Sequence, residues 1–353
     1  MAPARWRSGP SERPSWRGRP TCWTGAIFSL PVRRSSRESR RSSVRCPRTR
    51  ATSTGENPLT ARVAVNHVWK LLFGNGLVRT LDDFGLRGDR PTHPELLDWL
   101  AGQFRSELGW SRKALIRSIV TSSTYRQASS YRPELVEVDP ENRLLARQNR
   151  IRVESEIVRD VQLAASGLLA RRIGGPSVFP PMPEDRAKLS YANSFTWKNS
   201  DGEDRYRRGM YTFFKRTIPH PNLMTFDSPD ANVSCVARTV SNTPLQALML
   251  LNNETHVEAA QALACRLLAR SGDDAARLGH AMRVCVSRPA TEREIASLRG
   301  VLDTARRYYA AHRDEAKSLL GRHAPPTVPA EEAAAWIAAV RVVLNLDEFI
   351  TRE

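Results

Sequence analysis

Five residues whose side chains can bind ligands or ions gather within 19 positions of the sequence: His220, Asp227, Asp230, Cys235 and Arg238. Histidine with two carboxylates can hold a hard or borderline divalent metal ion, so His220, Asp227 and Asp230 are candidate metal ligands. The guanidinium of Arg238 could hold an anionic or sulfated group through paired hydrogen bonds. If these residues form a site, we expect their polar atoms to converge on one concave surface. His-Pro, Ser-Pro and Asp-Ala-Asn are also ordinary turn sequences, so a loop without a site is the alternative.

A second set of candidates lies between Glu154 and Asp160, where Glu154, Glu156 and Asp160 could supply paired carboxylates for acid and base chemistry beside Arg159. Such a charged helical face is more often a solvated surface, and we favour that interpretation. The sequence contains no H-E-x-x-H, no G-x-S-x-G, no Walker A motif and no full G-x-G-x-x-G. It therefore identifies no reaction.

The elements that must position these residues are predicted to be mainly α-helical. Apolar residues recur with helical spacing from 57 to 73, 92 to 104, 111 to 120 and 153 to 168, and again in several helices after residue 243. Between residues 176 and 242 this periodicity is lost, so we expect a long irregular segment there, with 210–216 as the best candidate for a strand. Such a long loop region is often functional, and a binding site is sought there first.

Helix starts are predicted from capping residues. Asn57 before Pro58 and Ser111 are typical N-caps. Asp139 before Pro140 predicts another helical stretch. Capping boxes are expected at three pairs, in each of which a threonine is followed three residues later by Glu or Gln: Thr92 with Glu95, Thr243 with Gln246, and Thr291 with Glu294.

The net charge of +17 is concentrated in an arginine-rich leader, residues 1–54. Its first 50 residues carry 13 Arg, no Lys and 2 Glu, which leaves +6 for the remaining 303 residues. The leader has neither helical nor strand periodicity, so we interpret it as disordered, and as an out-of-frame or misassigned start rather than a basic arm for RNA. Because the helical body is only mildly basic, nucleic-acid binding ranks last among the functions considered.

Five cysteines at wide spacing contain no C-x-x-C pair, so neither a zinc ribbon nor a C-x-x-C-H haem attachment is encoded, and no cofactor is expected in this chain. No apolar run approaches the roughly 20 residues that a membrane span requires. The best candidate for a signal-peptide core, residues 25–32, contains Ser29 and Pro31 and is followed by two arginines, so we predict no signal peptide.

Several blocks of residues 55–353 together resemble one protein family. They include N-P-L-T-A-R-V-A-V-N-H-V-W (57–69), F-G-N-G-L-V-R-T (73–80), T-H-P-E-L-L-D-W-L (92–100), D-P-E-N-R-L-L (139–145), S-N-T-P-L-Q-A-L (241–248) and L-N-L-D-E-F-I-T-R-E (344–353). These blocks resemble the planctomycete cytochrome-associated C-terminal domain, domain of unknown function 1553. Where members of that family usually show Arg after the Asn of the first helix, this chain has His67.

The resemblance implies a bacterial, extracytoplasmic protein whose relatives often carry c-type haem in an upstream domain. From it we expect a binding or assembly module with a cytochrome-type or polysaccharide-related partner. The alternatives are a metal-dependent hydrolase or oxidoreductase with its site in residues 215–238, and nucleic-acid binding through the leader.

Overall fold

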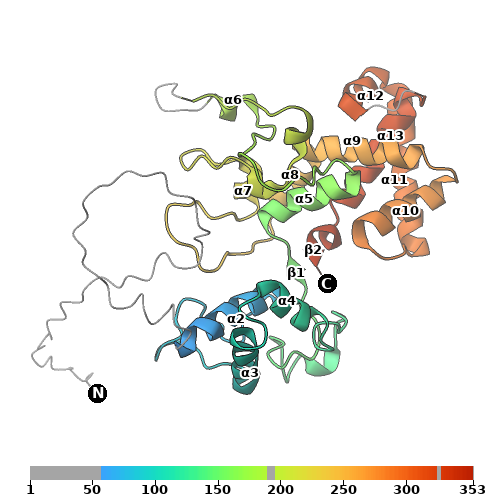
Figure 1. Cartoon of the computed structure of the whole chain (residues 1–353). Helices are drawn as coiled ribbons and strands as arrows, with labels where there is room; N and C mark the ends of the chain where they lie inside the picture. The colour runs from blue at the N-terminus through green and yellow to red at the C-terminus, as the bar shows by residue number, and fades with distance from the viewer. Residues whose placement is uncertain (1–56, 189–194, 324–326, 353) are drawn as a thin grey trace, which may run out of the picture. The chain divides into compact units, whose positions relative to one another are not determined.

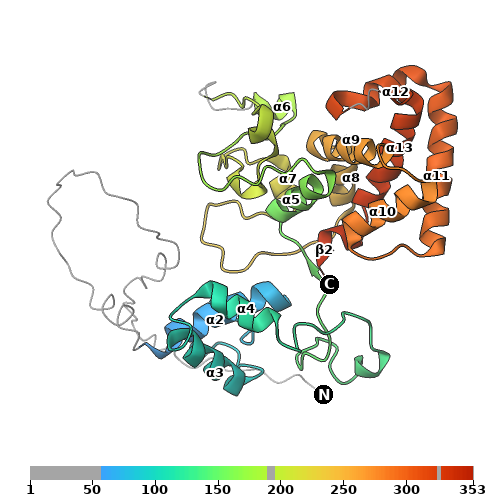
Figure 2. The ribbon, with the colours of Figure 1, turned by 45° about the vertical axis from the view of Figure 1, so that its right-hand side comes forward.

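The structure, a computed structural model, describes residues 57–188, 195–323 and 327–352, and the statements below refer to these residues (Figures 1 and 2). The fold is mainly α-helical, as predicted. The named strands, β1 (Ile151–Arg152) and β2 (Thr351–Arg352), pair antiparallel over two residues each. The leader, residues 1–54, lies outside the described residues. None of the described helices combines the length and the apolar character that crossing a membrane requires.

The first helices enclose a core of their own: α2 (Pro58–Phe73), α3 (Pro94–Arg105) and α4 (Arg112–Val120). Leu97, Leu100 and Leu115 are buried in this core at the positions that their helical spacing predicts. Asn57 caps α2, with its Oδ1 accepting from the backbone N–H of Leu59 at 2.8 Å. A single turn, η1 (Pro133–Leu135), lies in the chain that follows.

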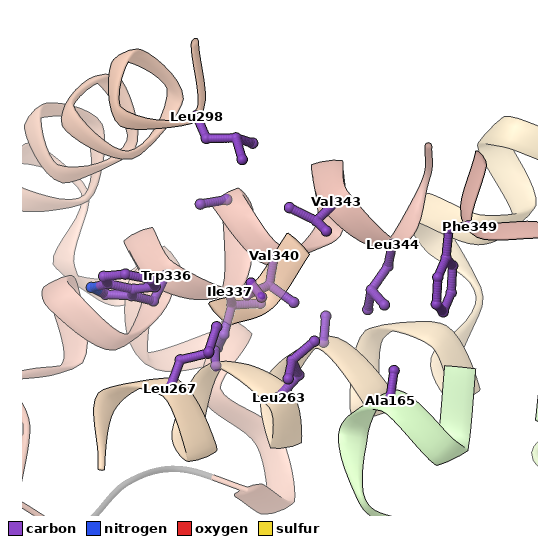
Figure 3. Close-up of a cluster of buried hydrophobic side chains, with 14 of the residues drawn as sticks. Ala165, Leu263, Leu267, Leu298, Trp336, Ile337, Val340, Val343, Leu344 and Phe349 are labelled. Atoms are coloured by element: carbon purple, nitrogen blue, oxygen red, sulfur yellow. The ribbon is translucent and has the colours of Figure 1, made fainter. Parts of the chain in front are cut away.

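A larger core is formed by α5 (Ser155–Ser166), α8 (Pro244–Asn252), α9 (Glu254–Leu268), α10 (Asp274–Val286), α11 (Glu292–Ala311) and α13 (Ala330–Leu344). Figure 3 shows Leu263 and Leu267 of α9 facing Trp336 and Val340 of α13, and all four side chains are buried. Helix α12 (Arg313–Leu320) was not predicted. It is followed by η5 (Gly321–His323), and η6 (Asp347–Ile350) precedes β2.

The irregular segment was predicted correctly, but the strand within it was not. In residues 176–188 and 195–242 the helical elements are short turns: α6 (Glu184–Ala187), η3 (Gly202–Tyr206), η4 (Gly209–Tyr211) and α7 (Pro221–Thr225). In the predicted strand, Thr212 makes one isolated bridge to Val178. Phe213 instead packs against Phe179, with ring centroids 4.9 Å apart, and Phe179 packs edge-on against Trp197. The aromatic residues that suggested a strand thus form a cluster of rings.

One predicted helix start, at Asp139, and two predicted capping boxes, at Thr92 and Thr243, are absent. Asp139 starts no helix, because its carboxylate accepts from the N–H groups of Arg143 and Leu144, both at 2.7 Å, in a turn. Helix α3 begins at Pro94 with His93 as N-cap, so Thr92 caps nothing. Thr243 is the N-cap of α8, but its side chain makes no capping hydrogen bond.

The third capping box is present, since the Thr291 hydroxyl accepts from the Glu294 N–H while the Glu294 carboxylate accepts from the Thr291 N–H.

Candidate functional site

The predicted ligand His220 is a buried structural residue. It caps α7, its Nδ1 accepts from the Asn222 N–H at 3.3 Å, and its Nε2 donates to the Pro181 carbonyl at 3.0 Å. Burial lowers the pKa of His220 to about 4, so the ring is neutral at pH 7. Both ring nitrogens therefore already have protein partners.

Asp227 closes the base of the loop that follows α7. Its backbone has a φ of 62°, and its carboxylate accepts from the backbone N–H of Ser241 at 2.8 Å and from the Ser241 hydroxyl at 2.8 and 2.9 Å. These bonds join the two ends of the chain from 227 to 241. Asp227 thus positions the loop.

The three remaining candidates lie along that loop with separate partners. Asp230 is exposed and accepts from the N–H of Asn232 at 3.0 Å, as in an Asx turn, and the exposed thiol of Cys235 donates to the Ala237 carbonyl at 3.1 Å. Arg238 binds the Glu156 carboxylate of α5 through two hydrogen bonds, of 2.6 and 3.1 Å.

The five predicted residues thus each have partners of their own. Across the described ranges, no three His, Cys, Asp or Glu side chains are grouped so that they could hold a metal ion. His220, Asp227 and Asp230 are therefore not brought together as a metal site.

The same region does converge on Gln246, which the sequence suggested only as part of a capping box. Gln246 is 1% exposed. Its Nε2 donates to the Thr225 carbonyl at 3.0 Å and to the Ser241 hydroxyl at 3.1 Å, and its Oε1 accepts from Arg152 at 2.5 Å. This amide joins α7, the end of the loop, α8 and β1.

Four exposed apolar residues, Met224, Val240, Leu245 and Leu248, lie on the segments that this buried amide joins, and we call them the apolar rim. Met224 precedes Thr225 and Val240 precedes Ser241, the two residues to which the Gln246 amide donates. Leu245 precedes Gln246 itself, and Leu248 lies about one turn further along α8. The exposed fractions of the four residues, in that order, are 39%, 63%, 68% and 53%. The polar interior therefore fixes the backbone that presents an apolar surface to solvent.

A buried arginine network fastens the preceding irregular chain to α5 and α9. Arg159 donates to the carbonyls of Arg205 and Arg207 at 2.6 and 3.2 Å, and Arg205 binds the Glu258 carboxylate with Nη2 to Oε1 at 2.6 Å. The Arg207 guanidinium lies 3.7 Å from the ring centroid of Tyr211. The prediction that the face from 154 to 160 is solvated is thus wrong for Arg159, which is 5% exposed.

Two carboxylates one helical turn apart on α9 were the available sequence signal for this network. Glu254 and Glu258 both bind Arg205, and Glu258 is 5% exposed. Beside them His256 is buried near Arg159 and His220, and burial, aided by those neighbours, lowers its pKa to about 3. The buried polar groups of this region hold the fold in one arrangement.

Comparison with known proteins gives one family match. The family model described as PSD1, protein of unknown function (DUF1553), matches residues 49–302. The chain belongs to this family. The matched DUF1553 region contains the first core, the irregular segment, the Gln246 centre and the apolar rim. No curated protein and no solved structure matches the chain.

Proposed function

We propose that this DUF1553 chain is an extracytoplasmic binding or assembly module, and that the apolar rim is its contact surface. The single observation that supports this most strongly is the exposure of Met224, Val240, Leu245 and Leu248 around a rigid buried centre. Contiguous exposed apolar side chains mark protein contact sites more often than isolated ones do.

Helix α8 has apolar side chains on both sides. Leu250 and Gln246 face the interior, whereas Leu245 and Leu248 face solvent. A helix that is apolar all round is normally buried on all sides. The outer face of α8 therefore has the composition of a surface that another molecule covers.

The loop from Pro229 to Val240 extends this surface. Among the described residues, no backbone–backbone hydrogen bond links residues 229–240 to another segment. Val236 in this loop is 45% exposed. The ion pairs of Arg238 with Glu156 and Glu154 attach the loop to α5. The ion pairs of Arg238 thus hold this loop next to α5.

The chemistry of the rim favours a protein partner over a polysaccharide. Its four side chains are aliphatic or thioether groups, and none is an aromatic ring on which a sugar could stack. We therefore favour the cytochrome-type partner over the polysaccharide-related one. No grouping of the described residues supports the metal-dependent alternative.

The experiment compares Leu245→Gln/Leu248→Gln with Leu86→Gln, a matched control at a fully exposed leucine between α2 and α3. Binding of a purified c-type cytochrome domain to the immobilised full chain is measured by interferometry. We expect the double variant to weaken Kd at least tenfold and the control to leave it unchanged. Equal binding by all three proteins, or none by the wild type, would overturn the proposal.

A further inference from the structure

A groove of about 590 Å³ runs between α11 and α13, which lie side by side (Figure 2). Its lining is mostly small or apolar and includes Ser297, Gly300, Val301, Thr304 and Tyr308 of α11 and Ala338 of α13. At one end stands the half-exposed ring of Tyr308, which stacks on His312 with centroids 4.2 Å apart. The groove is independent of the apolar rim.

Gly300 lies on this groove in the interior of a 20-residue helix. Glycine is unfavourable in a helix interior. A Cβ atom added to Gly300 would meet nothing within 4 Å, so the packing of the described chain does not require a glycine there. Glycine does allow another backbone to approach closely.

Arginines without carboxylate partners among the described residues flank Gly300 along α11. Arg293 and Arg307 lie seven residues before and after Gly300, on one flank of α11, and Arg307 donates to the Thr304 hydroxyl at 3.1 Å. Arg341, which lies near Tyr309, donates to the Leu251 carbonyl. Within residues 57–188, 195–323 and 327–352, none of these three arginines forms an ion pair.

Two other arginines close to α11 show that this is not general for the helix. Arg288 binds both Glu294 and Glu348, and Arg306 binds both Asp274 and Glu332. Two acidic groups next to groove residues have partners of their own: Asp303 lies 3.4 Å from Arg306, and Glu315 accepts from the Tyr308 hydroxyl at 2.8 Å. Among the described residues of this helix, Arg293 and Arg307 thus carry positive charge that no ion pair compensates.

We propose that the groove is the docking site for an acidic amphipathic helix of a partner protein. From Ser297 to Tyr308 the groove is about 16 Å long, which matches three turns at 1.5 Å per residue. Small side chains let two helices approach to the usual 8–10 Å, and apolar residues at i, i+3, i+4 and i+7 would fill the groove. Carboxylates on the flanks would pair with the arginines. A second copy of this chain is disfavoured as the partner because both copies carry a net positive charge.

The test uses two synthetic 18-residue helical peptides with leucines at i, i+3, i+4 and i+7, one with glutamates at the remaining positions and one with lysines. Binding to the full chain is measured by fluorescence anisotropy. We expect saturable binding of the glutamate peptide and at least tenfold weaker binding of the lysine peptide. Equal binding of both peptides, or no saturable binding of either, would overturn the proposal.

Variants locate the site. Gly300→Leu should weaken binding at least tenfold, whereas Gly102→Leu, at a helical glycine that also has open space around it, should not. Arg293→Gln/Arg307→Gln should weaken binding and reduce its dependence on salt. This double variant provides the test of the site if Gly300→Leu fails to fold. Leu245→Gln/Leu248→Gln should leave peptide binding intact, which separates this site from the apolar rim. Full binding by both groove variants, or dimers of wild type that Gly300→Leu dissociates, would contradict a helix-docking site.

Discussion

At the scale of single residues, the buried ion pair of Arg205 and Glu258 carries the clearest energetic consequence. Both side chains are almost fully buried, and the exposed Arg322 lies 3.6 Å from the Glu258 carboxylate as a second ion-pair partner. Removing one partner of a buried pair leaves an uncompensated charge, which costs about 3–5 kcal/mol. Removing an exposed partner costs about 1 kcal/mol or less.

We therefore expect Arg205→Met to lower the free energy of unfolding by about 3–5 kcal/mol and Arg322→Met to lower it by less than about 1 kcal/mol. Urea denaturation of the full chain measures both. Similar small losses in the two variants would mean that the buried network does not fasten the irregular segment.

The two buried histidines predict how stability changes with pH. The folded pKa values of His220 and His256 are lowered to about 4 and about 3, whereas an unfolded histidine titrates near 6.5. Their contribution is complete above pH 6.5 and is lost as the pH falls toward 4, because the unfolded chain then binds more protons.

Between pH 6 and 4.5 we expect each histidine to lower stability by up to about 1.4 kcal/mol per pH unit. The free energy of unfolding, measured at four pH values, should fall less steeply in His256→Gln than in the wild type. Parallel pH profiles of the two proteins would count against the buried neutral histidine.

At the scale of elements, two similar capping patterns, Thr291 with Glu294 and Thr243 with Gln246, have different outcomes. Thr291 and Glu294 form a box at the start of α11, and the Glu294 carboxylate that completes it also binds Arg288. Gln246 occupies the same position relative to Thr243, but its amide is drawn inward to Thr225, Ser241 and Arg152. The local sequence is sufficient for the box at Thr291, whereas at Thr243 the tertiary contacts of Gln246 prevent it.

We expect Thr291→Ala to cost about 0.5–2 kcal/mol and Thr243→Ala to cost less than about 0.5 kcal/mol. Thermal unfolding monitored by circular dichroism tests the pair. A large loss for Thr243→Ala would reveal a role that its side-chain contacts do not show.

The helical elements could be predicted because their information is local: apolar spacing for α2 and α9, and capping side chains at Asn57 and Ser111. The candidate site could be predicted only as a region. That Arg238 binds Glu156 and that Arg159 is buried depend on contacts across 82 and 46 residues of chain, which spacing does not encode. The predictions for the leader lie outside the described residues.

At the scale of the whole molecule, the two proposed surfaces differ in chemistry. The apolar rim is uncharged, so its binding should depend weakly on salt, whereas binding at the arginine-lined groove should weaken steeply as ionic strength rises. The buried polar network serves neither surface directly. It holds the irregular segment so that α8 and the adjoining loop keep their positions.

The measurement that tests the central claim most directly is hydrogen–deuterium exchange of the full chain with and without a c-type cytochrome domain. We predict that added protection falls on α8 and on residues 229–240, around the apolar rim. Protection confined to other helices, or no change at α8, would contradict the account.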